Sequence, residues 1–307
     1  MQSRSMALVD AFTTDPLSGN AAGVIPNAGG LSDAQCQAVA RELAVSETAF
    51  VSSSTEADRR IRFFTPTQPV DLCGHATIAA HAYLHDAGQL GVGRHSLETA
   101  VGTVAIEIEP DGTVWMTQAS PTVVQRAVDY DRLAEALGTD VSTLQDVGAD
   151  IPVARASTGL PVLVVPINFL ESLGSLDPDF GAIEALSDEY DVAGIYAFTF
   201  DTLSTEAVAH GRFFAPAVGI NEDPVTGTAS GACAAYFHTA GSVAFDDLDD
   251  ELRFEQGDFL DRAGRVRTRV EADDGGSTRV RVGGQAVTTV DGTITIPEDE
   301  ADDIIEA

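Results

Sequence analysis

The sequence contains no lysine, and all 17 of its basic residues are arginine, against 48 acidic residues. The formal net charge is therefore −31. At low salt this charge repels nucleic acid phosphates and anionic membranes, so we expect no nucleic-acid or membrane partner. It also loads the fold with self-repulsion, whose reach falls to roughly 3 Å at molar salt. The composition favours a halophilic protein of a saline cytoplasm over an acidic protein of an ordinary cell.

Cysteine is scarce and long apolar runs are absent. Cys36, Cys73 and Cys233 form neither an even set nor a C-x-x-C, which argues against a disulfide framework and a zinc site. The first residues lack the apolar centre of a signal peptide, and no apolar run approaches the ~20 residues of a membrane helix. The longest run, residues 160–167, contains two prolines and predicts a strand. We expect a soluble cytoplasmic protein with reduced thiols.

An internal repeat is the most informative feature that is present. The segment Arg-Phe-Phe-Thr-Pro at 62–66 returns as Arg-Phe-Phe-Ala-Pro at 212–216. After each copy come a turn-rich loop and a stretch of small and apolar residues, at 74–84 and 227–237. Neither stretch has a polar face. We therefore predict two helices that are buried on all sides.

Short strands surround both buried helices. The predicted strand pairs are 101–108 with 113–117, and 266–270 with 278–282, the second pair joined by a turn at 273–276. A surface helix is predicted from Asp33 to Leu43 with Ser32 as its N-cap, and 179–186 is its expected counterpart. Each half therefore resembles a sheet wrapped around one central helix.

This density of strands predicts an α+β fold with two pseudo-symmetric halves. We assign residues 6–122 plus 286–297 to the first domain, because the last strand is expected to return to it. Residues 123–285 form the second predicted domain. An acidic tail, residues 298–307, is expected to be frayed.

The start of each buried helix is the first place to look for function. A helix N-terminus carries unpaired N–H groups and a partial positive charge. Two such ends, related by the repeat, are expected to face each other across the domain junction and bind an anion there. Gly74 and Gly227 would allow close approach to the backbone. A small carboxylate is the expected substrate.

Residue type alone leaves a structural role open for every candidate side chain. His75 can transfer protons near neutral pH, or cap a helix in a satisfied network. Asp223 can act as acid or base, or as a turn residue before Pro224. Asn20 can contact substrate or merely belong to a turn. Glu47 is one of 48 acidic residues, and its chemistry alone does not single it out.

The motifs occur in an order and spacing that are specific together, although each is weak alone. They are Val9-Asp10-Ala11-Phe12, Gly19-Asn20, Ser46-Glu47-Thr48, Phe64-Thr65-Pro66, Asp71-Leu72-Cys73-Gly74-His75-Ala76-Thr77, Phe214-Ala215-Pro216, Glu222-Asp223-Pro224-Val225-Thr226-Gly227-Thr228-Ala229 and Glu255-Gln256-Gly257. Over nearly its whole length the chain resembles the phenazine biosynthesis PhzF-like family of the diaminopimelate epimerase-like superfamily.

The resemblance implies two barrel-like, mainly antiparallel halves, each around its central helix, with the active site in the cleft between them. It implies that Glu47 is the main proton-transfer residue and that His75 and Asp223 share in catalysis. It implies that Gly74 offers its N–H to the substrate. Together with the candidates argued above, the expected substrate-binding residues are Asn20, Gly74, Gly227 and Thr228. It implies no metal and no organic cofactor. By analogy, and because closed dimers are common, we expect a homodimer.

Three positions qualify the resemblance. Diaminopimelate epimerases and proline racemases resemble this fold but use two facing thiols, and here Cys73 takes the first thiol position while Thr226 takes the second. A hydroxyl loses its proton far less readily than a thiol, so two-thiol racemisation is not expected. Thr228 stands where the phenazine enzymes have serine.

We expect a cofactor-independent isomerase that transfers protons on a small carboxylate substrate. Two alternatives stay open. One is a racemase or epimerase of amino or hydroxy acids that uses Cys73 with a non-thiol base. The other is a small-ligand binding protein that performs no chemistry.

Overall fold

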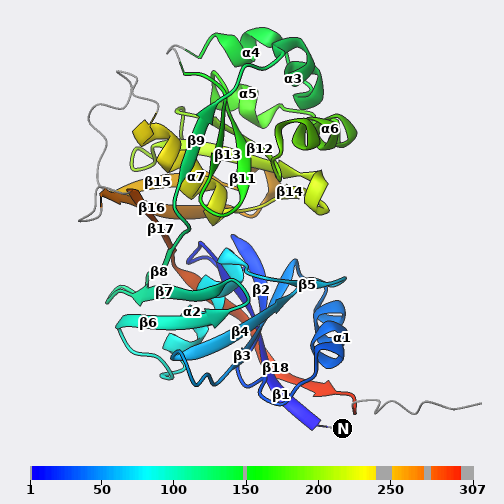
Figure 1. Cartoon of the computed structure of the whole chain (residues 1–307), viewed down its shortest axis with the longest axis vertical. Coiled ribbons are helices and arrows are strands. Elements are labelled where there is room, and N and C mark those ends of the chain that lie inside the picture. The colour runs from blue at the N-terminus through cyan, green and yellow to red at the C-terminus, as the bar shows by residue number, and fades with distance from the viewer. Residues whose placement is uncertain (1, 148–150, 240–250, 273–277, 299–307) are drawn as a thin grey trace, which may run out of the picture. The chain divides into compact units, whose positions relative to one another are not determined.

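The computed structural model describes residues 2–147, 151–239, 251–272 and 278–298, and the chain divides into two compact units (Figure 1). The first unit comprises Met1–Leu17, Ala21–Val114 and Gln285–Ala307, and the second comprises Ser18–Asn20 and Trp115–Gly284. The predicted turn at 273–276 and all but the first residue of the predicted tail lie outside the described residues. Within the described ranges, no helix combines the length and apolar character that a membrane span requires.

The first unit contains most of the elements at the two ends of the sequence. They are β1 (Gln2–Ala11), β2 (Asn20–Ile25), α1 (Asp33–Leu43), β3 (Glu47–Ser52), β4 (Arg59–Phe64), β5 (Pro69–Val70), α2 (Gly74–Asp86), β6 (Gly93–Thr99), β7 (Gly102–Ile108) and β18 (Ala286–Ile296). The division between the units falls within β8 (Val114–Thr117). Strand β18 pairs antiparallel with β1 along its length, which confirms the predicted return of the last strand.

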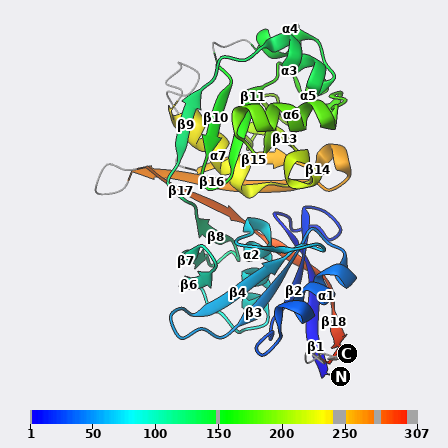
Figure 2. The same cartoon turned by 45° about the vertical axis from the view of Figure 1, so that its right-hand side comes forward.

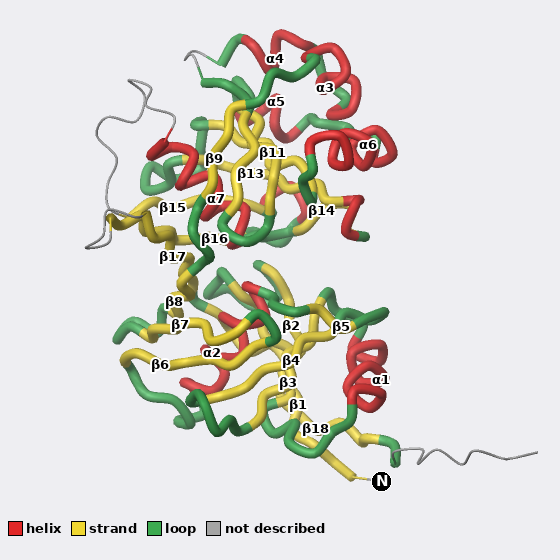
Figure 3. Tube along the Cα trace, viewed as in Figure 1, coloured by secondary structure: helices red, strands yellow, loops and turns green. Residues whose placement is uncertain are grey.

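The second unit contains more helix. Its elements are β9 (Thr122–Gln125), α3 (Tyr130–Leu137), α4 (Val141–Gln145), β10 (Ala154–Ser157), β11 (Pro161–Pro166), α5 (Leu170–Gly174), α6 (Phe180–Tyr190), β12 (Gly194–Thr199), β13 (Ala209–Ala215), β14 (Ile220–Asp223), α7 (Gly227–Thr239), β15 (Glu251–Gln256), β16 (Gly264–Ala272) and β17 (Thr278–Gly284). Leucines and isoleucines of α3, α5 and α6 share one core cluster with residues of β11 and β12. The helices α3, α4, α5 and α6 of this unit are drawn in red in Figure 3.

Strand pairing repeats in the same order within the two units. In the first, β2 is parallel to β3, β3 is antiparallel to β4, and β4 is antiparallel to β5 but parallel to β6. Strands β11 to β15 form the same series in the second. Helices α1 and α6 lie in the first crossover of each series, and α2 and α7 lie in the second. The repeat in the sequence is therefore a repeat of topology, and the predicted α+β fold is confirmed.

The two central helices are buried as predicted. Helix α2 contacts β1, β3 and β18, and α7 contacts β9, β10, β16 and β17 (Figure 2). Their sequences consist mainly of small and apolar residues without a continuous polar face, so strands pack on every side. Helix α1 begins after Ser32, whose hydroxyl accepts a hydrogen bond from Gln35 N–H, while the Gln35 side-chain oxygen accepts one from Ser32 N–H. This capping box confirms the predicted N-cap.

Candidate functional site

The position of Glu47 is fixed by the close pairing of two parallel strands. It is the first residue of β3 and lies opposite Ala22 of β2. The next pair joins Gly23 to Thr48, and a Cβ atom at Gly23 would lie 2.7 Å from the Thr48 hydroxyl oxygen. Only glycine therefore permits this approach of the strands. The register places Glu47 at the edge of the unit's buried core.

Helix α2 begins without a side-chain cap. Its N-cap, Cys73, has extended backbone angles and its thiol accepts no capping hydrogen bond. Gly74 and His75 are the first two helical residues, and the first intrahelical bond runs from Thr77 N–H to the Cys73 carbonyl oxygen at 3.1 Å. Within the described part of the chain, no side chain makes a capping hydrogen bond to this helix end, whose backbone carries a partial positive charge. The end is therefore suited to an anionic ligand group.

His75 lies at the centre of a cluster at this helix end. Its Nε2 atom lies 3.4 Å from Glu47 Oε2 and 3.3 Å from the Ser46 hydroxyl, and its Nδ1 lies 3.4 Å from Cys73 Sγ. The side chains of His75 and Glu47 are only 10% and 14% exposed. The imidazole therefore bridges a carboxylate and a thiol in a largely dehydrated setting.

One oxygen of Glu47 lacks a hydrogen-bond donor. Oε2 is shielded from solvent, and among the described residues no group donates a hydrogen bond to it. Buried carboxylate oxygens are normally satisfied, because an unpaired one loses its hydration without compensation. An unsatisfied oxygen at a helix N-terminus is free to accept a proton or a donor from a ligand.

The start of α7 in the second unit has the opposite character. The Asp223 carboxylate accepts hydrogen bonds from the Asn20 amide, at 2.8 Å, and from the Thr226 hydroxyl. Gln256 donates to the Asp223 carbonyl oxygen at 2.8 Å and to the Thr226 hydroxyl at 3.2 Å, and its own oxygen accepts from Thr226 N–H at 3.1 Å. These groups form one hydrogen-bond network immediately before Gly227, the first residue of the helix.

The remaining predicted binding residues lie beside this network. Gly227 is buried, and Thr228 is partly buried with its carbonyl oxygen accepting from the Thr158 hydroxyl at 3.1 Å. The Asn20 amide nitrogen also donates to the Val225 carbonyl oxygen at 2.9 Å. Both of its hydrogens are thus used within the protein, which leaves the side-chain oxygen for any contact with substrate.

A comparison with known families matches residues 9–292 to the PhzC-PhzF family of phenazine biosynthesis-like proteins. The chain belongs to this family. Among its relatives in the PhzF-like family, an uncharacterized isomerase of Clostridium acetobutylicum is 35% identical over 286 residues, covering 91% of this chain and 94% of that protein. The trans-2,3-dihydro-3-hydroxyanthranilate isomerase of Pseudomonas chlororaphis is 32% identical over 300 residues, covering 94% and 98%. The protein is an isomerase of the PhzF-like family.

Solved structures agree with this assignment. A PhzF-family protein of Bacillus anthracis superposes with a TM-score of 0.88 at 32% identity, over 96% of this chain and 100% of that one. A hydroxyproline epimerase of Agrobacterium vitis gives a TM-score of 0.60 at 16% identity, over 96% and 91%. The second likeness shows the fold alone. The predicted membership of an epimerase-like fold is confirmed.

Within this PhzF-like chain, the structure brings Glu47 together with His75 and Gly74 in the first unit. Independently, it brings Asp223 together with Asn20 and Gly227 in the second. Two contributors had no predicted role.

Those two are Ser46 and Gln256. Ser46 belongs to the motif Ser46-Glu47-Thr48 and Gln256 to the motif Glu255-Gln256-Gly257. Membership of these motifs was the only sequence feature that could have indicated a role. Their hydrogen bonds to His75 and Thr226 depend on strand positions that one sequence does not reveal.

A buried carboxylate–imidazole pair lies next to Gln256. Glu255 is fully buried, accepts hydrogen bonds from Leu203 and Ser204 N–H at 2.8 Å, and lies 3.1 Å from His210 Nδ1. Burial alone would raise the pKa of Glu255, but the hydrogen bonds from His210 and the two N–H groups hold that pKa below its ordinary value. This charge anchors a loop and involves none of the predicted site residues.

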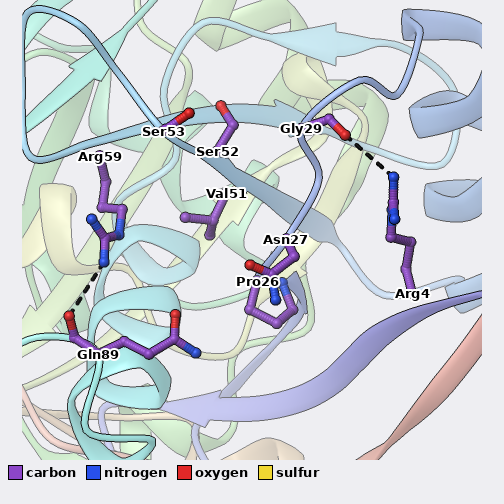
Figure 4. A pocket seen from close by; sticks show the side chains of 9 residues that line it. All are labelled: Arg4, Pro26, Asn27, Gly29, Val51, Ser52, Ser53, Arg59 and Gln89. Atoms are coloured by element: carbon purple, nitrogen blue, oxygen red, sulfur yellow. Dashed lines mark hydrogen bonds between the residues drawn. The ribbon is translucent and has the colours of Figure 1, made fainter.

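A separate pocket of about 380 Å³ opens on the first unit (Figure 4). Arg4 and Arg59 line it, donating to the carbonyl oxygens of Gly29 and Gln89 at 3.3 and 3.2 Å. Ser52, the last residue of β3, also lines it, whereas Glu47 begins that strand. The pocket therefore contains none of the predicted site residues.

Proposed function

We propose that the protein is a cofactor-independent isomerase that relocates a proton on a small carboxylate substrate, with Glu47 as the acid/base residue. The observation that carries the proposal is the dehydrated Glu47 oxygen, which lacks a donor and lies beside His75. A base with this geometry can accept a proton from a bound substrate without first losing another hydrogen bond. The family assignment supports the reaction class.

The proposed reaction balances without a second reactant. Glu47 removes a proton from a carbon next to a carbonyl or a double bond, and the resulting carboxylic acid returns a proton to a different carbon of the same molecule. His75 donates a hydrogen bond to the reacting group and exchanges protons with Glu47. The N–H groups at Gly74 stabilise the negative charge that develops in the transition state.

In the second unit we propose a binding role rather than proton transfer. The Asp223 carboxylate already accepts two hydrogen bonds, so it is less available than Glu47 to take a proton. Asp223 and Asn20 hold the start of α7, where the N–H groups of Gly227 and Thr228 bind an anionic group of the substrate. Asp223 then serves catalysis by positioning.

The test is isomerisation in deuterated water. Trans-2,3-dihydro-3-hydroxyanthranilate is the first candidate substrate, because a relative of similar length is named for it. An isomerase incorporates deuterium at carbon, whereas a binding protein does not. Glu47→Gln should lower turnover about 10³-fold, in the range that general acid–base groups contribute. The matched control is Glu42→Gln, at an exposed position of α1, which should keep full activity. Full activity in Glu47→Gln would refute the assignment.

A racemase that uses Cys73 is the second candidate, since Cys73 Sγ lies 3.4 Å from His75 Nδ1. It predicts the reverse pattern of losses. Cys73→Ala would abolish exchange at a stereocentre and Glu47→Gln would be tolerated. We expect instead that Cys73→Ala retains activity within about tenfold.

We further propose that the protein works at high salt in the cytoplasm, as a homodimer. A net charge of −31 without lysine supports the saline setting, because screening relieves self-repulsion. Urea unfolding at ~0.1 M and ~2 M KCl tests it, with the midpoint expected to rise with salt. An unchanged or falling midpoint would contradict a halophilic character. Sedimentation at both concentrations tests the dimer.

A further inference from the structure

Three different metal-ligand side chains meet at the N-terminus of α2. A carboxylate oxygen of Glu47, the Cys73 sulfur and a His75 ring nitrogen lie within 4.8 Å of one another. We propose that this cluster binds a borderline-soft divalent cation, best matched by Zn²⁺, and that the bound metal inhibits the isomerase by occupying Glu47. The inhibition rests on the proposed function of Glu47, whereas the metal binding does not.

The ligand types and spacings fit zinc. Zn²⁺ accepts thiolate, imidazole and carboxylate ligands at about 2.0–2.3 Å in a tetrahedron, which places ligand atoms roughly 3.3–3.7 Å apart. His75 Nε2 lies 3.4 Å from Glu47 Oε2 and 4.0 Å from Cys73 Sγ. Every separation in the cluster is at most 4.8 Å, so the widest must close by no more than about 1 Å. Side-chain rotation of Glu47, at the start of its strand, can supply this movement.

The Glu47 carboxylate offsets the partial positive charge of the α2 N-terminus, which by itself would disfavour a cation. Glu47 Oε2 is shielded from solvent and accepts no hydrogen bond from the described residues, so it has an unused lone pair that a metal could coordinate. Cys73 and His75 are both buried, which limits competition from water. Three protein ligands leave one coordination position for water or a substrate carboxylate. With the metal bound, the Glu47 oxygen is coordinated and cannot take a proton from substrate.

The other two cysteines provide internal controls. Cys36 and Cys233 are fully buried in the core. Burial raises the pKa of Cys36 to about 11 and raises that of Cys233 well above its ordinary value. Both therefore stay protonated near neutral pH and offer no thiolate. A thiolate–metal signal from this protein would report on Cys73.

Cobalt(II) is the probe, because a cobalt–thiolate bond absorbs in the near ultraviolet and carboxylate or imidazole ligands alone do not. The full-length chain is titrated with Co²⁺ without substrate. We expect a charge-transfer band that saturates at one ion per chain, is displaced by Zn²⁺, disappears in Cys73→Ala and persists in Cys36→Ala and Cys233→Ala. His75→Gln should weaken Zn²⁺ binding about 100-fold or more, since even outer-shell changes cost 10–100-fold. A wild-type protein without the band, or a band that survives Cys73→Ala, would overturn the site.

Circular dichroism establishes that each variant is folded. If Cys73→Ala does not fold, Glu47→Gln takes its place and should weaken Co²⁺ binding by a similar factor. In the activity arm, Zn²⁺ should stop turnover and a chelator should restore it. If Co²⁺ gives no thiolate band while turnover depends on Glu47, the metal site fails and the proposed function stands. If the band forms but Zn²⁺ leaves turnover unchanged, the inhibition fails.

Discussion

Helix α2 starts beside a carboxylate oxygen to which no described residue donates, whereas α7 starts beside a carboxylate that accepts two hydrogen bonds. The two helices occupy equivalent places in the repeated topology, and both are buried. At the first start stand a cysteine and a histidine, and at the second stand two threonines. The two halves therefore share a backbone topology but carry different reactive side chains at the equivalent helix starts.

The contrast shows how a duplicated fold can separate reactivity from anchoring. Side chains that transfer protons must be left partly unsatisfied, which costs stability at that helix end. A network in which every side chain has a hydrogen-bond partner, such as the one around Asp223, stabilises the fold. Its groups are poorly placed to exchange protons with a substrate. The hydrogen bonding of each helix start therefore fits its proposed role, which is proton transfer at α2 and substrate binding at α7.

The largest expected effect comes from removing the two carboxylates in turn. Asp223→Ala strands the donors of Asn20 and Thr226 in a buried position, so we expect a loss of about 3 kcal/mol in the free energy of unfolding. Glu47→Ala removes an oxygen that no donor satisfies and should cost under about 1 kcal/mol. Urea denaturation of both variants measures this. Equal losses would remove the contrast between the two helix starts.

Much of this fold could be predicted because its determinants are local. The copies at 62–66 and 212–216 reveal the repeat, and small-residue stretches identify α2 and α7. Ser32 with Gln35 marks the start of α1. For α6, the predicted start at 179 proved to be the N-cap, and the helix continues to Tyr190. Such signals act within a few residues and do not need tertiary context.

The site was harder to predict because its contacts are distant in sequence. Asn20 and Asp223 are 203 positions apart, and Ser46 and His75 are 29 apart. Tertiary packing of strands, loops and helices brings such residues together. Glu47 had no distinguishing chemistry among 48 acidic residues, and the resemblance alone selected it. The unsatisfied oxygen that makes it a candidate base is a property of packing.

Thr77 and Thr226, buried near the starts of α2 and α7, allow a second test of the difference between the two helix starts. The expected difference between them in the free energy of unfolding is smaller than that between the carboxylates. The Thr226 hydroxyl donates to Asp223 and accepts from Gln256, whereas the Thr77 hydroxyl donates only to the Cys73 carbonyl, which also accepts from Thr77 N–H. We expect Thr226→Val to cost about 2 kcal/mol and Thr77→Val about 1 kcal/mol. Thermal and urea unfolding would show the order, and the reverse order would contradict the difference in satisfaction.

The smallest expected effect is on the pH dependence of stability. It concerns Glu255, the buried carboxylate next to Gln256 in the second unit. Burial would raise the pKa of Glu255, but hydrogen bonds from His210, Leu203 and Ser204 lower it. The unfolded carboxyl group titrates near ~4.3, so below that pH the unfolded chain binds a proton that the folded chain does not. The stabilisation is complete above that value and is lost as the pH falls through the lower, folded pKa.

Glu255→Gln removes this dependence. The difference in urea midpoint between wild type and Glu255→Gln should be constant near neutral pH and shrink as the pH falls below about 4. The exposed Glu42→Gln variant controls for the loss of one negative charge. A difference that grows on acidification would mean that Glu255 is not held as a carboxylate by its donors. In that case, of these two carboxylates of the second unit, only Asp223 would be well hydrogen-bonded. Glu255 would then be as poorly satisfied as Glu47.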